Sequence, residues 1–134
     1  MDIKTIIFTE DCPLDCRYCD PKNENSYKKH SGMNKKELFD LLEKIDKECK
    51  KETKIIFSGG EPFLYWNWLK ELIIKYQNRF IYEFNTSGYL LTEEILCFLH
   101  NYNCFFNLSV DGDEKLTNYL RPVKHTKYHT GYFK

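Results

Sequence analysis

The sequence predicts an α/β domain in which four βα units form a parallel sheet. Apolar residues alternate along the chain between strand-like runs and helix-like stripes, which is typical of helices packed around parallel strands. Each apolar run is short and is followed by polar or glycine-containing residues. A chain of 134 residues with 42% hydrophobic content fits one domain, which we assign to residues 1–134.

The four expected strands cover residues 3–9, 54–57, 79–85 and 104–110. Between the first two, Asn34 and Glu37 form a capping box ahead of an apolar stripe at helical spacing. A second stripe runs over residues 64–76, and its aromatic residues are interpreted as helix packing. Thr92 caps a third helix, whose positive end carries Glu93 and Glu94.

Two segments carry no periodic pattern. The lysine-rich stretch over residues 20–33 extends the loop that follows the first strand, and we weigh a solvated loop equally against a lid. The tail, residues 113–134, is predicted to be irregular because Pro122 and Gly131 oppose a helix, and that argues against metal binding by its two histidines, His125 and His129. The remaining thiols are expected to be small buried groups: Cys49, Cys97 and Cys104.

Charge and hydropathy limit the possible partners. The chain has 20 basic and 20 acidic side chains, so no overall field attracts nucleic acid or anionic lipid. Its apolar runs are too short to span a bilayer, and acidic Asp2 leads directly into a strand pattern. We therefore expect a cytoplasmic protein with neither a membrane nor a nucleic-acid partner.

Three thiols lie in one loop, residues 12–19, directly after the first strand. Cys12, Cys16 and Cys19 have spacings that let a loop wrap around an iron-sulfur cluster. Three ligands leave one iron of a four-iron cluster open for chemistry. A zinc site completed by His30 is an alternative, and a disulfide framework is less favoured because adjacent loop cysteines fit a reducing compartment.

The C-x3-C-x2-C spacing, with Tyr18 before the last cysteine, resembles the signature of the radical S-adenosylmethionine (radical SAM) superfamily. The resemblance implies that a [4Fe-4S] cluster binds S-adenosylmethionine through its open iron. It extends to Gly59, Gly60, Glu61 and Pro62, which resemble the family's glycine-glycine-glutamate-proline motif. In the family this motif holds the amino group of the cofactor, whereas read alone it is a strand-to-helix turn.

The resemblance also assigns cofactor contacts to the ends of the last two strands. Asn85 and Ser87 match a segment that reaches the methionyl or ribose groups, and Ser109 and Asp111 match one that reaches the ribose and carboxylate. Read alone, Asp111 with the following glycine is more simply an ordinary turn. Arg121 resembles an arginine that binds the cofactor carboxylate in some relatives, but in an irregular tail we expect it to be solvated.

The implied activity is reductive cleavage of S-adenosylmethionine to a 5'-deoxyadenosyl radical that abstracts hydrogen from a substrate. The motifs look most like peptide-modifying members of the SPASM type, so a peptide or protein substrate is expected, with flavodoxin or ferredoxin as the one-electron donor. The family fold is usually a partial barrel of six βα units, and four units suggest a truncated chain, a companion chain or an oligomer. A glycyl-radical-activating enzyme and a non-catalytic or split half-domain remain alternatives.

Overall fold

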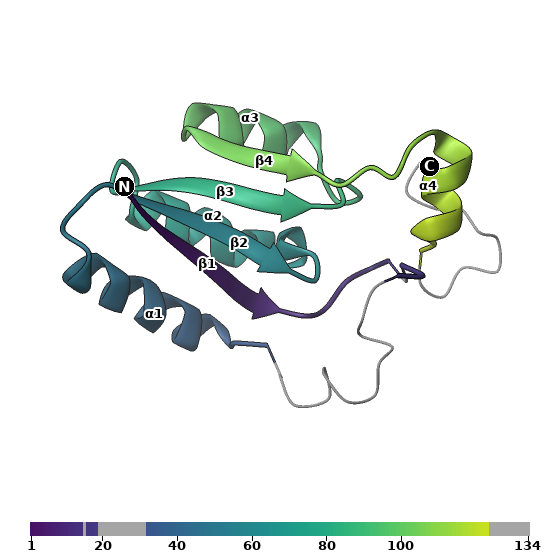
Figure 1. The fold of residues 1–134 in the computed structure, drawn as a ribbon. Coiled ribbons are helices and arrows are strands. Elements are labelled where there is room, and N and C mark those ends of the chain that lie inside the picture. The colour runs from purple at the N-terminus through teal and green to yellow at the C-terminus, as the bar shows by residue number, and fades with distance from the viewer. Residues whose placement is uncertain (15, 19–31, 124–134) are drawn as a thin grey trace.

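The computed structural model describes residues 1–14, 16–18 and 32–123, which contain a four-stranded parallel sheet of order β1-β2-β3-β4 (Figure 1). The strands are β1 (Asp2–Thr9), β2 (Thr53–Gly59), β3 (Phe80–Thr86) and β4 (Cys104–Leu108). The helical elements are α1 (Lys35–Glu48), the 3-10 turn η2 (Pro62–Tyr65), α2 (Trp66–Lys75), α3 (Glu93–Asn101) and α4 (Glu114–Leu120). The predicted α/β class, with a partial barrel-like parallel sheet of four βα units, is confirmed.

The helix starts form where capping residues were predicted. The Asn34 side chain accepts from the backbone N–H of Glu37 at 2.8 Å, and the Glu37 carboxylate accepts from the backbone N–H of Asn34 at 3.2 Å. At α3, the Thr92 hydroxyl accepts from the backbone N–H of Ile95 at 3.2 Å. These bonds satisfy amide groups that have no partner within the first turn of a helix.

The sheet has one covered and one open face. Helices α1, α2 and α3 pack on the same face, as Figure 1 shows, and the side chains that point toward them form an aromatic core. Phe57 lies at its centre, stacked on Phe84 with ring centroids 5.3 Å apart and on Tyr82 at 6.3 Å. Alternate residues point the other way, so Ile3 and Ile7 of β1 are more than half exposed at 59% and 58%.

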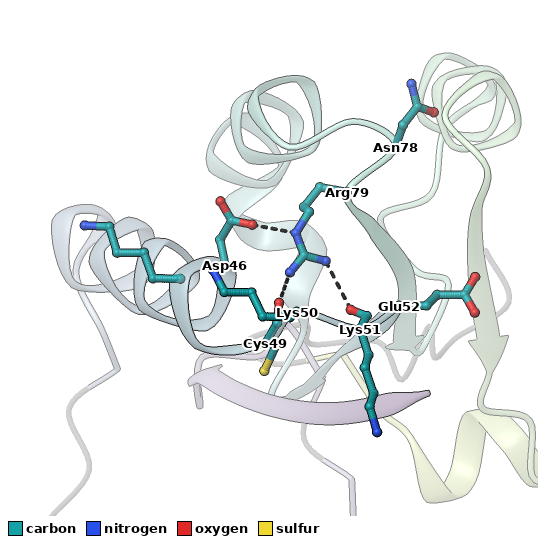
Figure 2. Close-up of a pocket in the computed structure, with 8 residues that line it drawn as sticks. Asp46, Cys49, Lys50, Lys51, Glu52, Asn78 and Arg79 are labelled. Carbon is teal, nitrogen blue, oxygen red and sulfur yellow. Dashed lines mark hydrogen bonds and ion pairs between the residues drawn. The ribbon is translucent and has the colours of Figure 1, made fainter.

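At the amino end of the strands, Arg79 fastens the α1–β2 connection (Figure 2). Its Nε donates to the Asp46 carboxylate at 2.5 Å, and its two terminal nitrogens donate to the carbonyl oxygens of Cys49 and Lys51. These residues line a surface pocket at the end of the sheet opposite to the cysteine loop. The ion pair and the two backbone contacts give Arg79 a structural role, which is to hold the α1–β2 connection against the start of β3.

Three predictions were wrong. The tail was expected to be irregular, but residues 114–120 form α4, because the Asp113 carboxylate accepts from the backbone N–H of Leu116 at 2.9 Å and caps a helix. Cys97 is exposed rather than buried, because it lies on the outer side of α3. Arg121 is not solvated: its side chain is 14% exposed and ion-paired.

The fourth strand ends at Leu108, two residues earlier than predicted, and it forms an edge of the sheet. The apolar side chains on both of its faces are partly exposed, with Phe105 at 52%, Phe106 at 38% and Leu108 at 47%. Among the residues that the structure describes, no further strand pairs with the outer side of β4, which also carries apolar surface, as expected for an edge strand. In the part of the chain that the structure describes, none of the helices has the length and apolar character needed to cross a bilayer.

Candidate functional site

The candidate site lies at the carboxyl ends of the strands. Figure 1 shows all four strands pointing to the same side of the molecule, with α4 beyond their ends. The cysteine loop follows β1, the two-glycine turn follows β2, and polar residues follow β3 and β4. Because parallel strands bring these connections to one edge, residues up to about 100 positions apart in the sequence become neighbours.

The two-glycine turn is hydrogen-bonded to the start of the cysteine loop. The backbone N–H of Gly60 donates to the Thr9 carbonyl at 2.9 Å, and that of Glu61 donates to the Asp11 carbonyl at 2.8 Å. The Tyr65 hydroxyl also bonds the Asp11 carboxylate. A side chain at Gly60 would overlap the Asp11 carbonyl, and Gly59 has φ of +115° with the Thr9 carbonyl 2.5 Å from where its Cβ would be. Both glycines are therefore required for this close approach.

Glu61 joins the turn to the end of β3. It is 1% exposed, and both carboxylate oxygens have partners within the protein. One oxygen accepts from the Thr86 hydroxyl at 2.7 Å and the Phe63 backbone N–H at 3.3 Å. The other accepts from the Ser87 hydroxyl at 2.7 Å and its backbone N–H at 3.0 Å. The described contacts of Glu61 thus fix the position of Ser87, and a direct contact with a ligand amine stays a prediction.

Two of the three predicted cluster ligands lie in the described part of the chain. Cys16 is buried and Cys12 is half-buried, and both belong to the loop held by the turn after β2. Cys19 and His30 lie outside the described residues, as do the tail histidines His125 and His129. Among the described residues, no three His, Cys, Asp or Glu side chains group closely enough to hold a metal ion.

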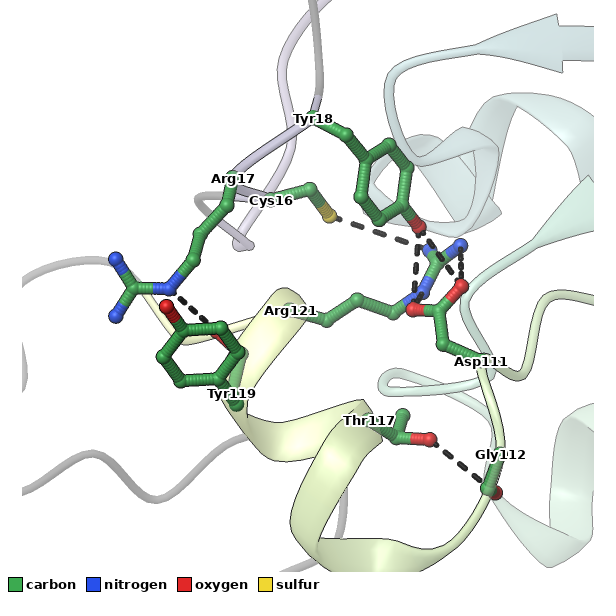
Figure 3. A network of polar contacts seen from close by, with 8 residues as sticks. All are labelled: Cys16, Arg17, Tyr18, Asp111, Gly112, Thr117, Tyr119 and Arg121. Atoms are coloured by element: carbon green, nitrogen blue, oxygen red, sulfur yellow. Dashed lines mark hydrogen bonds and ion pairs between the residues drawn. The ribbon is translucent and has the colours of Figure 1, made fainter.

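The far side of the cysteine loop rests on the end of α4. Leu14 and Val123 form an antiparallel bridge, and the backbone N–H of Arg17 donates to the Leu120 carbonyl at 2.8 Å. The Arg17 Nε donates to the Tyr119 carbonyl at 2.7 Å, with its guanidinium carbon 4.3 Å from the centre of the Tyr119 ring (Figure 3). The loop is therefore fastened on two sides, by the two-glycine turn and by α4.

Tyr18, Asp111 and Arg121 form a polar cluster beside Cys16 (Figure 3). The Tyr18 hydroxyl donates to the Asp111 carboxylate, with its oxygen 3.2 Å and 3.3 Å from the two acceptor oxygens. Burial raises the pKa of Tyr18 to about 12, Asp111 adds to the rise, and Arg121 opposes it. Burial alone would lower the pKa of Arg121, but the hydrogen bond to Asp111 and the charge interactions with Tyr18, Cys16 and Asp111 together outweigh burial, so the pKa is raised. The phenol stays neutral and the guanidinium charged at physiological pH.

On the open face, Asn85 belongs to a chain of polar side chains that crosses three strands. Its amide nitrogen lies 3.4 Å from the Ser58 hydroxyl, and its carbonyl accepts from Asn107 at 3.1 Å. Asn107 also donates to Glu83 at 2.6 Å, and Glu83 pairs with Lys54 at 2.7 Å. The hydrogen bond from Lys54 lowers the pKa of Glu83, so this carboxylate remains ionised at neutral pH.

Ser87, Ser109 and Asp111 lie close to the same edge but differ in their surroundings. Ser87 is buried beneath the turn after β2, whereas Ser109 is half-buried and its backbone N–H donates to the Thr86 carbonyl at 2.9 Å. Asp111 is half-buried and bonds Tyr18 and Arg121. Ser109 and Asp111 follow β4, which ends at Leu108, rather than forming part of it.

Sequence reasoning missed two groups that shape the site. Part of the polar chain of Lys54, Glu83 and Asn107 was detectable, since Lys54 and Glu83 alternate with buried residues along their strands. The contacts of α4 with the cysteine loop were not, because they depend on tertiary structure.

The donor set suits an iron-sulfur cluster. Thiolates are the usual ligands of such clusters, and the loop carries its cysteines where the turn and α4 hold its backbone. The described thiols Cys12 and Cys16, with Cys19 from the sequence, would hold the cluster. The hydroxyl, carboxylate and backbone groups at the other strand ends are suited to a polar organic cofactor.

Comparison with known proteins supports this interpretation. The model of the radical SAM superfamily matches residues 6–132. The radical SAM cyclopropyl synthase TigE of Paramaledivibacter caminithermalis is 28% identical over 131 residues, which cover 85% of this chain and 28% of that protein. An uncharacterized protein of Methanocaldococcus jannaschii is 33% identical over 125 residues, covering 89% of this chain and 41% of that protein.

Solved structures show the same fold. The anSMEcpe protein with bound AdoMet, which is S-adenosylmethionine, aligns with a TM-score of 0.74 at 26% identity, over 92% of this chain and 35% of that one. Its complex with AdoMet and the Kp18Cys peptide gives a TM-score of 0.71 at 26% identity, with the same coverage. The chain thus spans less than half the length of these relatives. Proteins of the matched superfamily use a [4Fe-4S] cluster and S-adenosylmethionine.

Proposed function

We propose that this chain, which belongs to the radical SAM superfamily, supplies the cluster and cofactor site of an enzyme that acts on a peptide or protein. When bound, the cluster and S-adenosylmethionine would supply a 5'-deoxyadenosyl radical by reductive cleavage, and this radical would take a hydrogen atom from the substrate. The protein residues serve to bind, orient and shield these groups. Superfamily membership supports the radical chemistry.

The observation that carries the proposal is the joining of the cysteine loop to the two-glycine turn. Hydrogen bonds from Gly60 and Glu61 to Thr9 and Asp11 place a thiol-bearing loop next to a turn whose carboxylate fixes the end of β3. A metal cluster held in the loop would then lie beside polar groups from the neighbouring strand ends. We propose that Cys12, Cys16 and Cys19 hold the cluster.

We propose that the cofactor lies along the remaining strand ends. The backbone of Gly59 and Gly60, with Glu61 and Pro62, would border its amino group, with Glu61 acting at least partly through Ser87, because its carboxylate is bonded there. The other proposed contacts are half-buried or partly exposed polar side chains at the same edge: Tyr18, Asn85, Ser109 and Asp111.

A peptide or protein substrate is supported by one relative of known structure, the anSMEcpe protein, which has been solved with a bound peptide. The open face of the sheet offers apolar side chains, Ile3 and Ile7, next to the polar chain that includes Asn85. Such a mixture of apolar and hydrogen-bonding surface suits a peptide.

The partners are part of the proposal. A low-potential cluster needs a one-electron donor, for which flavodoxin or ferredoxin is suited, and a reducing compartment such as the cytoplasm. The exposed edge of β4, with Phe106 and Leu108, favours completion of the sheet by a companion chain or a further segment.

Product analysis tests the proposed chemistry. The chain is reconstituted anaerobically with iron and sulfide, reduced with dithionite and incubated with S-adenosylmethionine, and the mixture is separated by chromatography. We expect 5'-deoxyadenosine and methionine in equal amounts, and neither product from the Cys16→Ala variant. A fully loaded chain that releases no 5'-deoxyadenosine would refute the proposed activity of this chain.

A further inference from the structure

Arg121 lies against the sulfur of one predicted cluster ligand. Its Nη1 is 4.0 Å from the Sγ atom of Cys16, within the range of a hydrogen bond to sulfur. The two residues are 105 positions apart in the sequence, and the end of α4 brings them together (Figure 3). Cys16 is buried and the Arg121 side chain is 14% exposed, so little water screens the contact.

Asp111 fixes the direction of the Arg121 guanidinium. Nε of Arg121 donates to one carboxylate oxygen at 2.6 Å, and Nη2 donates to the other at 3.4 Å. This two-point pairing holds the planar group in one orientation and leaves Nη1 directed at Cys16. Tyr18 lies over the guanidinium, with the ring centre 5.2 Å away, and its hydroxyl bonds the same carboxylate.

We propose that Arg121 is a positioning residue of the cluster site, which donates from Nη1 to the sulfur of Cys16 and raises the reduction potential of the cluster. The inference rests on the proposed function. A reduced cluster carries one more negative charge than an oxidised one, so a nearby cation and a hydrogen bond to a ligating sulfur favour the reduced form. Asp111 acts indirectly, by holding the Arg121 guanidinium in place.

The geometry favours this role over two simpler ones, that of a solvated surface arginine and that of a residue that only holds the cysteine loop in place. A solvated arginine would not be held by a two-point ion pair at 14% exposure. The cysteine loop has other fastenings, since Leu14 pairs with Val123 and Arg17 bonds two backbone carbonyls. Arg121 is thus not needed merely to hold the loop, and its Nη1 faces the Sγ atom of Cys16, one of the three sulfurs of the loop that would bind iron.

The test is a redox titration of the reconstituted chain, followed by electron paramagnetic resonance and carried out without S-adenosylmethionine. Replacing Arg121 by Gln removes the charge and shortens the side chain. We expect the midpoint potential to become more negative by about 59 mV, which is a tenfold loss in the equilibrium constant for reduction. Arg121→Lys keeps the charge but loses the planar guanidinium with its several N–H donors, so the midpoint potential should shift in the same direction by a smaller amount.

Arg79→Gln is the matched control. Arg79 is also ion-paired with an aspartate, at the opposite end of the sheet, so its replacement removes the same charge far from the cysteine loop. We expect the wild-type potential from this variant, with iron and sulfide content measured for each protein. If Arg121→Gln fails to load iron, the titration of Arg121→Lys decides.

The outcomes separate the two proposals. A wild-type potential in the Arg121 variants, combined with weaker binding of S-adenosylmethionine, would show that Arg121 acts on the cofactor alone and would overturn this inference. The cluster site itself would then stand. A wild-type chain that takes up no four-iron cluster would instead overturn the proposed function and this inference with it.

Discussion

Removal of the Glu61 carboxylate is the sharpest test of how the two-glycine turn is held. The side chain is 1% exposed and accepts four hydrogen bonds, three of them at 2.7 to 3.0 Å. Hydrogen bonds to a charged group contribute about 1.5–3 kcal/mol each, and buried donors left without partners add to the loss. Because such terms are not additive, we expect Glu61→Ala to lower the free energy of unfolding by about 3–4 kcal/mol.

Glu61→Gln tests the charge with little change in shape. Each carboxylate oxygen accepts from one backbone N–H, that of Phe63 or that of Ser87. An amide NH2 in either place would therefore face a donor, and we expect a loss of about 2 kcal/mol. Glu52→Gln, at an exposed position before β2, is the control and should change stability by less than about 0.5 kcal/mol.

Urea unfolding of the cluster-free chain, followed by circular dichroism, measures these differences. With a slope of about 1–3 kcal/mol per molar urea, the Glu61→Ala midpoint should fall by about 2 M. Both Glu61 variants unfolding within about 0.5 kcal/mol of the wild type would refute the reasoning. The carboxylate would then not hold the end of β3, and its contacts with Thr86 and Ser87 would carry no free energy.

The remaining predictions concern other parts of the site and the core. Gly60→Ala should displace the cysteine loop, because a Cβ there overlaps the Asp11 carbonyl, and iron uptake after reconstitution should fall sharply; full uptake would contradict this. Among the described residues, the Tyr82 hydroxyl is the buried side-chain oxygen without a hydrogen-bond partner, so Tyr82→Phe should raise the free energy of unfolding by up to about 1 kcal/mol in urea melts, and a clear loss would indicate an overlooked partner. Asp113→Ala removes the cap of α4 and should cost about 1 kcal/mol, with no change if α4 forms without its cap. Burial raises the pKa of Tyr18 to about 12, so the contribution of the neutral Tyr18 phenol to stability should be complete below pH 10 and lost as the pH rises through 12. The free energies of unfolding of the wild type and the Tyr18→Phe variant, compared across that range, measure this loss. Identical pH profiles would argue against it.

The sheet and the first three helices could be predicted because local patterns determine them. The strands alternate between helix-facing and open-face residues, and Asn34 and Thr92 provide capping signals that need no tertiary information. Cys97 could also have been placed correctly. It lies two positions from Ile95 and from Leu99, both buried, so helical periodicity puts it on the opposite side of α3.

The contacts around α4 could not be predicted from the sequence. Asp113 is a capping residue, but a helix of seven residues before Pro122 gives a weak periodic signal. The burial of Arg121 depends on Asp111 and on the cysteine loop, which sequence separation hides. For the same reason, the sequence indicated only a cofactor-binding motif or a strand-to-helix turn for the glycines after β2, whereas the structure shows that they also allow contact with the cysteine loop.

We propose that the cysteine loop holds a four-iron cluster with one iron open to S-adenosylmethionine. The most direct test is electron paramagnetic resonance of the anaerobically reconstituted, dithionite-reduced chain, recorded with and without S-adenosylmethionine. We predict the signal of a reduced [4Fe-4S] cluster that shifts when S-adenosylmethionine is added and that is lost in the Cys16→Ala variant. A chain that takes up no such cluster, or a cluster whose signal is indifferent to S-adenosylmethionine, would contradict the account.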